Sequence, residues 1–242
     1  MFSEYLFNKY DLNKYFNELS KIYKTIDNTP LEIILVGGAS VLINYNFRKS
    51  TNDADALIPS SKAIKKAIKL TAKMFNLDND WLNMEFKKSS SYSDELKNIA
   101  EDYKTFNDVI KVKTVNDKYL VAMKLKSGRL YKNDLSDVIG IIAEHIENKN
   151  PITLELIKDA SKTLYGDYEN ISYESRMFFE NVILKCKDYK KLYLNTKNEE
   201  MQNLDIFNKV KKENPERLVA IGINNVIKEV KNKISINNSL IE

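Results

Sequence analysis

The sequence of 242 residues predicts an α+β fold followed by a helical C-terminal region. The first observation is that three short segments, at about residues 33–36, 53–58 and 109–115, indicate strands, and that the first and third of them are rich in β-branched residues. The second is that only helical spacing of apolar residues remains after about Tyr168. We therefore expect a first domain with N-terminal helices over residues 1–166 and a helical C-terminal region over residues 167–242.

Start and stop signals place the individual elements. Pro59 ends the second strand, Pro151 separates two helices, and Pro215 is typical of the first position of a helix. The lysine- and serine-rich segment 87–95 has no apolar period, so we expect a mobile loop there. The apolar spacing first predicts a helix over 2–26 broken near 11–13, a strand over 33–36, a helix over 39–45 and a strand over 53–58. A helix capped by Ser60 or Ser61 follows, and then a strand over 109–115. Three further helices are predicted, one over 119–127, one that begins after Asn133, and one over 153–164.

The composition is that of a globular protein and excludes several kinds of site. Charged residues make up 30% of the chain and hydrophobic residues 43%. The net charge of +4 is compatible with a nucleotide or RNA partner, but a lysine-rich solvated surface explains it equally well. The single Cys186 excludes an intramolecular disulfide and a cysteine-cluster metal site, and the single His145 argues against a histidine-based zinc site.

The chain shows no targeting or membrane signal. No apolar run approaches the length of a membrane span, and the segment Met1–Tyr10 is too polar for a signal peptide. We therefore expect a cytoplasmic protein without a membrane partner.

A glycine turn follows the first predicted strand. Gly37 and Gly38 allow the backbone to turn sharply and leave room for a phosphate against bare N–H groups. Ser40 adds a hydroxyl at the start of the next helix. The alternative is a chance glycine pair, since such pairs are common.

Two aspartates follow with one residue between them. Alternate side chains of a strand point the same way, so Asp53 and Asp55 share a face. Two carboxylates beside a glycine turn form a site for a hard cation, and Mg²⁺ prefers one or two carboxylates together with substrate phosphates. The alternative is an aspartate pair on an ordinary surface.

The ordered set of these residues resembles the core motif of the polymerase-β-like nucleotidyltransferase superfamily. The matching patterns are Gly-Gly-x-Ser at 37–40 and Arg-x-Ser-Thr-x-Asp-x-Asp at 48–55. The resemblance implies a nucleotidyltransferase fold for residues 1–166, with a small mixed β-sheet flanked by helices. It also implies that Asp53 and Asp55 hold Mg²⁺ (or Mn²⁺), and that an NTP substrate is bound by Gly37, Gly38, Ser40, Arg48, Ser50, Thr51 and Arg129.

The resemblance extends over about residues 30–165. The motifs around Trp81, Lys124, Arg129 and Asp134 keep the order seen in a branch of small bacterial nucleotidyltransferase-like proteins, many of unknown function. Related branches include the toxins of abortive-infection and type IV toxin–antitoxin systems. The resemblance therefore also suggests a toxin role, with an antitoxin-type protein as a partner.

Lys124 places a charge within an apolar helical run. Such a lysine must reach water or meet an anion, and in the toxin-like branch the matching lysine lies in the active site. Arg129 could bind phosphate in the same way, or it could hold Asp134. Asp134 and Asp137 stand in the first turn of a helix, where the dipole favours carboxylates, yet the resemblance also makes them catalytic candidates.

The third catalytic carboxylate of the superfamily is the least defined residue. Asp108 lies directly before the strand at 109–115 and is the nearest candidate, although it could equally be a turn residue. Trp81 either packs in the core or stacks on a base. His145 lies near a helix C-terminus, and the dipole explains it without a functional role.

Two functions from different classes fit these residues. The first is an enzyme that uses Mg²⁺ to transfer a nucleoside monophosphate from an NTP to an RNA such as tRNA, a protein or a small molecule. The second is a degenerate relative that binds a nucleotide or a partner protein without turnover.

Overall fold

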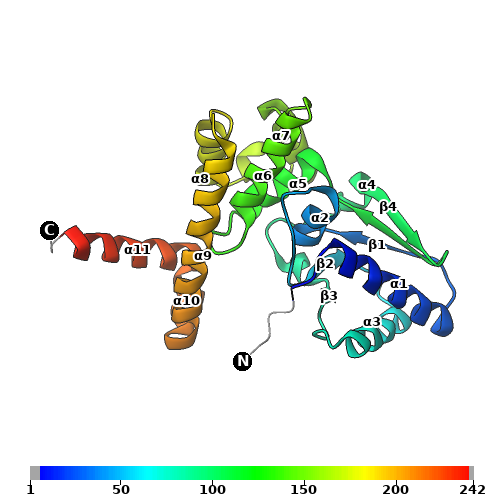
Figure 1. Ribbon diagram of the computed structural model, residues 1–242. Helices are drawn as coiled ribbons and strands as arrows, with labels where there is room; N and C mark the ends of the chain where they lie inside the picture. Colours follow the sequence, from blue (N-terminus) through cyan, green and yellow to red (C-terminus); the bar gives the residue numbers. More distant parts are fainter. Residues whose placement is uncertain (1–5, 240–242) are drawn as a thin grey trace.

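The computed structural model describes residues 6–239, with side chains up to residue 233, and contains a mixed five-stranded sheet in the half drawn on the right of Figure 1. The strand order is β3-β2-β1-β5-β4. The strands are β1 (Leu31–Leu35), β2 (Ala54–Leu57), β3 (Leu82–Asn83), β4 (Glu101–Phe106) and β5 (Ile110–Thr114). β1 pairs parallel with β5 and antiparallel with β2, which confirms the predicted α+β class with a small mixed sheet.

Helices cover both faces of this sheet and create two cores. α1 (Lys9–Ile26) and α3 (Lys62–Phe75) pack on one face, where Ile33 and Leu35 are buried. The other core contains Ile34 and is built largely from α5 (Asp117–Ser127), α6 (Asp134–Glu147) and α7 (Leu154–Tyr165). The alternation of side chains along β1 explains this division, because neighbouring residues of a strand face opposite sides.

The other helical elements are shorter or lie toward the C-terminus. Ser61, one of the two residues that the sequence predicts as the cap, caps α3 by accepting a hydrogen bond from the backbone N–H of Ile64. The remaining elements are α2 (Gly37–Asn44), the 3₁₀ turn η1 (Glu85–Lys88), α4 (Leu96–Ile99), the 3₁₀ turn η2 (Tyr168–Asn170), α8 (Tyr173–Phe178), the π-helical turn η3 (Phe179–Ile183), α9 (Tyr189–Glu213), α10 (Pro215–Ile221) and α11 (Ile223–Ser239).

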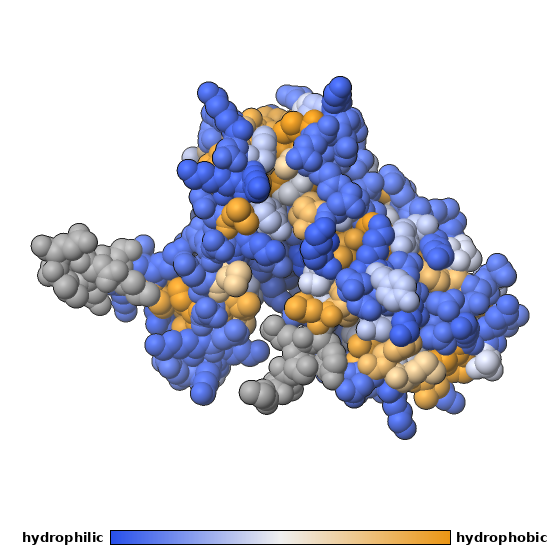
Figure 2. Space-filling view, in the orientation of Figure 1, coloured by the Kyte–Doolittle hydropathy of each residue, from blue (hydrophilic) through white to orange (hydrophobic). Residues whose placement is uncertain are grey.

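The C-terminal region is helical, as predicted. α6 packs on both α5 and α9 and so lies between them (Figure 1). α10 and α11 pack on α9. α10 and α11 are separate helices, because Gly222 between them adopts a φ of +80°. No helix among the described residues is long and apolar enough to cross a membrane, and the face shown in Figure 2 is mostly hydrophilic with separate apolar patches.

The N-terminal helix differs from the prediction. The sequence favoured a helix over 2–26 with a break near Asp11, but α1 is continuous from Lys9. The polar residues at this point form a capping box: the Asn8 side chain accepts from the backbone N–H of Asp11, and the Asp11 carboxylate accepts from that of Asn8. The signal therefore marked a helix start, and residues 2–5 lie outside the described part.

Strand direction brings the glycine turn and the aspartate pair to one end of the sheet. β1 and β5 run parallel and end together, with Leu35 opposite Thr114. β2 runs the opposite way and begins at this end, so Asp53 and Asp55 lie at its start. The end of β1, the start of β2 and the end of β5 therefore lie side by side at this end of the sheet.

Candidate functional site

A cavity of about 570 Å³ opens at this end of the sheet. It lies between the glycine turn, the start of β2, the segment connecting α5 to α6, and α9. Its lining includes Gly37, Gly38, Arg48, Thr51, Asp53, Asp55, Glu85, Lys124, Arg129, Tyr131, Lys132, Asn133, Asp134, Glu200, Met201 and Leu204. Most residues that the sequence assigned to a site are therefore brought together.

The glycine turn requires glycine for two different reasons. Gly37 has a φ of +57°, which residues with a side chain rarely adopt, and an added Cβ would lie 3.4 Å from Oδ2 of Asp55. At Gly38 an added Cβ would lie 2.9 Å from Oγ1 of Thr51 and 3.0 Å from Nη2 of Arg48. The turn thus keeps the backbone bare beside the aspartate pair.

Ser40 does not belong to the cavity wall, contrary to the expectation that its hydroxyl binds phosphate. The side chain is fully buried. Its Oγ lies 2.5 Å from Oγ1 of Thr114 and donates to the carbonyl of Val115. Ser40 therefore joins α2 to the end of β5 through these hydrogen bonds.

This arrangement gives a testable distinction for Ser40. Ser40→Ala is expected to lower the free energy of unfolding by about 1–3 kcal/mol, because it removes two buried hydrogen-bond contacts, to Thr114 and to Val115. NTP affinity should stay unchanged, since the hydroxyl faces away from the cavity. Urea denaturation and NTP titration check this, with the exposed Ser60→Ala as a matched control. A variant that is stable but loses NTP affinity would contradict the assignment.

The aspartate pair lies in two different environments. Asp53 is exposed just before β2, whereas Asp55 is half-buried within the strand. Burial and the charge of Asp53 raise the pKa of Asp55 to about 6, although Arg129 and Lys124 partly oppose this. A cation bound between the two carboxylates would relieve their repulsion, so the donor set suits Mg²⁺.

Asp108 lies far from this pair. It stands with Asn107 in the hairpin turn between β4 and β5, and both have positive φ values, of 58° and 48°. The strand from Ile110 to Thr114 separates this turn from the cavity, a span of about 13 Å. The structure therefore does not bring Asp108 to the pair, and the turn explains the residue.

The described part of the chain offers no third acidic ligand grouped with the pair. Among residues 6–239, no three Asp, Glu, His or Cys residues are grouped so as to hold a metal ion. Protein ligation would rest on Asp53 and Asp55, which is sufficient for Mg²⁺ when substrate phosphates supply further oxygens.

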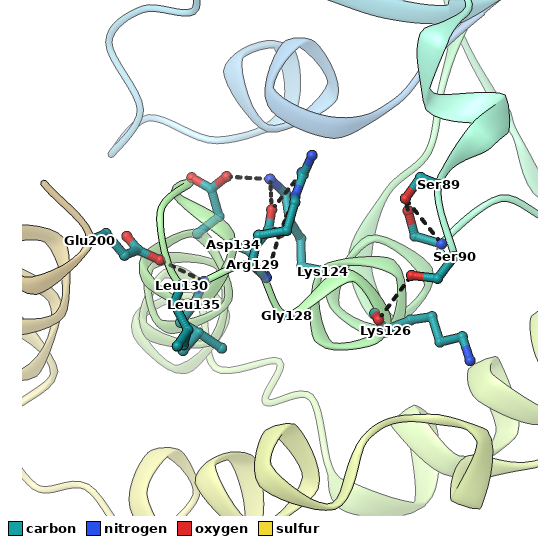
Figure 3. A network of polar contacts seen from close by, with 12 residues as sticks. Ser89, Ser90, Lys124, Lys126, Gly128, Arg129, Leu130, Asp134, Leu135 and Glu200 are labelled. Carbon is teal, nitrogen blue, oxygen red and sulfur yellow. Dashed lines mark hydrogen bonds and ion pairs between the residues drawn. The ribbon is translucent and has the colours of Figure 1, made fainter. Parts of the chain in front are cut away.

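Lys124, Asp134 and Asp137 form a buried ion network. Nζ of Lys124 lies 3.0 Å from Oδ1 of Asp134 and 2.8 Å from Oδ2 of Asp137. Nη1 of Arg48 donates to both oxygens of Asp137 at 2.7 Å. Arg129 donates hydrogen bonds to the Asp134 carboxylate from Nε at 2.8 Å and from Nη2 at 3.1 Å, as Figure 3 shows.

The network decides between the alternatives that the sequence left open for Lys124, Asp134 and Asp137. Burial opposes the charge of Lys124, but Asp137 and Asp134 hold its pKa above the usual range. Burial likewise opposes the charge of Asp134, but Lys124 and Arg129 hold its pKa well below the usual range. Lys124 thus meets carboxylates rather than water, and the two aspartates pair with cations rather than join Asp53 and Asp55.

The network itself carries a net positive charge. Arg48, Lys124 and Arg129 oppose Asp134 and Asp137, which leaves one net positive charge in the cluster. The Arg129 side chain is 38% exposed, so it is the cation of this cluster most open to a ligand.

The remaining sequence-assigned residues have structural contacts. Thr51 donates from Oγ1 to the carbonyl of Asp53, which fixes the approach to β2. Ser50 is absent from the cavity lining, and its carbonyl accepts from Nε of Arg48. Trp81 is 2% exposed and donates to the carbonyl of Ile68, which favours the core role over base stacking.

Glu200 is a cavity residue that the sequence did not indicate. From α9 it accepts the backbone N–H groups of Leu135 at 2.9 Å and Ser136 at 3.2 Å, and so caps α6 (Figure 3). Its other oxygen, Oε2, has no hydrogen-bond partner among the described residues. Since about 65 residues separate Glu200 from its partners, no local pattern could have paired them.

Glu200 should make stability depend on pH. Burial raises its pKa to about 8, so between the ordinary glutamate range and pH 8 the unfolded chain has lost a proton that the folded protein keeps. The contribution of Glu200 to stability therefore falls as pH rises through this window.

Glu200→Gln cannot titrate and is expected to gain stability over the parent protein between pH 5 and pH 8. Thermal unfolding across this range measures the gain, with the exposed neighbour Glu199→Gln as control. A difference between Glu200→Gln and the parent that does not change with pH would contradict the buried, protonated state.

Comparison with known families supplies one match. A model of a family described as a nucleotidyltransferase of unknown function (DUF6036) matches residues 10–194. No curated protein and no solved structure matches the chain. The matched range contains the glycine turn, the aspartate pair and the buried ion network, and it ends before Glu200.

Proposed function

We propose that this chain, which belongs to that nucleotidyltransferase family, transfers a nucleoside monophosphate from an NTP to a hydroxyl-bearing acceptor in the presence of Mg²⁺ or Mn²⁺. The observation that supports this most is the position of Asp53 and Asp55. They line one cavity with the bare backbone of Gly37 and Gly38 and with a cluster of net positive charge. Carboxylates for a cation and N–H groups for phosphates are the parts that such a transfer needs.

In the proposed reaction, an acceptor oxygen attacks the α-phosphorus of the NTP. A new oxygen–phosphorus bond forms, the bond between the α-phosphorus and the bridging oxygen of the β-phosphate breaks, and pyrophosphate leaves with the electron pair. The acceptor proton passes to solvent. A bound Mg²⁺ would neutralise phosphate charge and polarise the α-phosphate, with Asp53 and Asp55 as its protein ligands.

The chain's own groups would bind and orient the triphosphate. The backbone of Gly37 and Gly38 offers N–H groups, and Arg129 offers a partly exposed guanidinium. Lys124 and Arg48 would act through the buried network, which carries one net positive charge. Positioning and electrostatics would supply most of the rate.

The acceptor class is a further proposal. The resemblance to toxin nucleotidyltransferases suggests an RNA such as tRNA, and a protein or a small molecule would undergo the same chemistry. It also suggests an antitoxin-type partner that holds the activity off.

A second candidate function is nucleotide binding without turnover. It is favoured by the absence, within residues 6–239, of a third acidic residue grouped with the pair. Such a site could hold a metal and an NTP while lacking a base for the attacking hydroxyl.

Labelled substrates distinguish the two candidates. Each NTP, labelled at the α-phosphate, is incubated with the protein, Mg²⁺ or Mn²⁺, and separate pools of total RNA, protein and small molecules. The enzyme is expected to label one pool. Binding of an NTP without label in any pool would favour the binding module instead.

A further inference from the structure

An aromatic platform lies on the part of the cavity wall that is formed by the segment before α6 and by α9. Tyr131 lines the cavity, and its ring stacks on Phe207 of α9, with centroids 4.6 Å apart and planes at 24°. Met201 and Leu204, also from α9, line the same wall. These residues give the cavity an apolar, aromatic surface in addition to its polar, charged one.

The backbone that carries Tyr131 is fixed from two directions. The preceding residue, Leu130, accepts at its carbonyl from Nδ2 of Asn203 at 2.8 Å and donates its N–H to Oδ1 of Asn224 at 3.1 Å. Nδ2 of Asn224 also donates to the carbonyl of Gly128 at 2.9 Å. Asn203 and Asn224 lie on α9 and α11, so the C-terminal helices hold the platform in place before any ligand binds.

The cavity has another apolar region, but it is less suited to a ligand. Phe86, Leu120 and Met123 are members of the hydrophobic core and are each 9% exposed or less. Tyr131 is partly exposed and Met201 is 58% exposed, so the α9 wall is the accessible one.

We propose that Tyr131, supported by Phe207 and flanked by Met201 and Leu204, forms the subsite that stacks the nucleobase of the bound nucleotide. This rests on the proposed function, since a nucleotide would place its phosphates at the glycine turn and its planar base on the platform. Every nucleobase has a π-face, and a ring that is already oriented loses little freedom on stacking. The C-terminal helix α9, most of which lies beyond the family match that ends at residue 194, thereby contributes to substrate binding.

The test compares an NTP with inorganic tripolyphosphate, which carries the phosphates but no base. Both are titrated into the full-length protein with Mg²⁺. Tyr131→Ala is expected to weaken NTP binding about tenfold or more, while tripolyphosphate binding stays within about twofold of the parent. Tyr131→Phe should bind NTP as the parent does, and Tyr10→Ala, an exposed tyrosine on α1, is the matched control.

Three results of these titrations would overturn the nucleobase subsite. Unchanged NTP affinity in Tyr131→Ala would overturn the subsite, and so would an equal loss of both ligands, which indicates a structural role. If Tyr131→Ala does not fold, Tyr131→Leu keeps apolar volume without a ring, and NTP affinity equal to the parent in that variant would overturn stacking. A parent protein that binds neither ligand would overturn the proposed function itself.

Discussion

Replacing Lys124 by methionine is expected to destabilise the protein by about 3–5 kcal/mol, because it removes the cation from a buried ion network. Lys124 is 6% exposed and contacts both Asp134 and Asp137, which are 0% and 1% exposed. Without its Nζ, part of their charge would stay buried without compensation. Had Lys124 only reached toward water, the same change would be neutral or slightly stabilising.

Urea denaturation of the variant measures this effect. Lys132→Met is the matched control, because Lys132 lines the same cavity but is exposed, and a change there should stay within about 0.5 kcal/mol. A Lys124→Met variant as stable as the parent would contradict the network's role, and would mean that Arg48 and Arg129 alone compensate the aspartates.

The double variant Asp53→Asn with Asp55→Asn is expected to lower Mg²⁺-dependent NTP affinity by about 100-fold or more. Each carboxylate–cation contact is worth on the order of 1.5–3 kcal/mol, and the variant removes two. Stability should not fall, because the double variant removes a half-buried carboxylate at residue 55 together with its repulsion by Asp53. Titration of NTP with and without Mg²⁺ measures the loss.

Asp108→Asn controls for this change, since it makes the same substitution in the hairpin turn at the other end of the sheet, where asparagine tolerates a positive φ. NTP affinity equal to the parent in the double variant would remove the metal role from the pair. A loss in Asp108→Asn as large as in the double variant would show that the effect does not belong to the site.

Much of the fold could be predicted because local patterns determine it. β-branched runs identified β1 and β5, the stop at Pro59 delimited β2, and the pair Ser60 and Ser61 marked the start of α3. β4 escaped prediction because the strand Glu101–Phe106 is mostly exposed and carries charged residues, so it lacks an apolar run. The predicted break near Asp11 was wrong for a different reason, because polar residues of this kind favour both a break in a helix and a helix cap.

The membership of the site was more predictable than the contacts between its residues. Gly37, Gly38, Asp53 and Asp55 occupy one short segment, and the cavity does bring them together. The pairing of Lys124 with Asp134 and Asp137 is set by how α5 packs on α6, which no spacing in the sequence specifies.

Contributions from the C-terminal helices were the least predictable. Glu200 reaches α6, and Asn203 and Asn224 reach the segment before it, across long stretches of chain. These side chains are common on solvated helices, so their sequence gives no sign of a contact. The same holds for the stack of Tyr131 on Phe207, which depends on where α9 lies.

The most direct test of the account is the fate of the α-phosphate. An NTP labelled at the α-phosphate is incubated with Mg²⁺ and the acceptor pool, and both the label on the acceptor and the released pyrophosphate are measured. The account predicts one pyrophosphate for each label transferred, in the parent and in Asp108→Asn, and neither product in the double variant Asp53→Asn with Asp55→Asn. Transfer that survives in the double variant, or label that reaches the acceptor only from the γ-phosphate, would contradict nucleotidyl transfer at this aspartate pair.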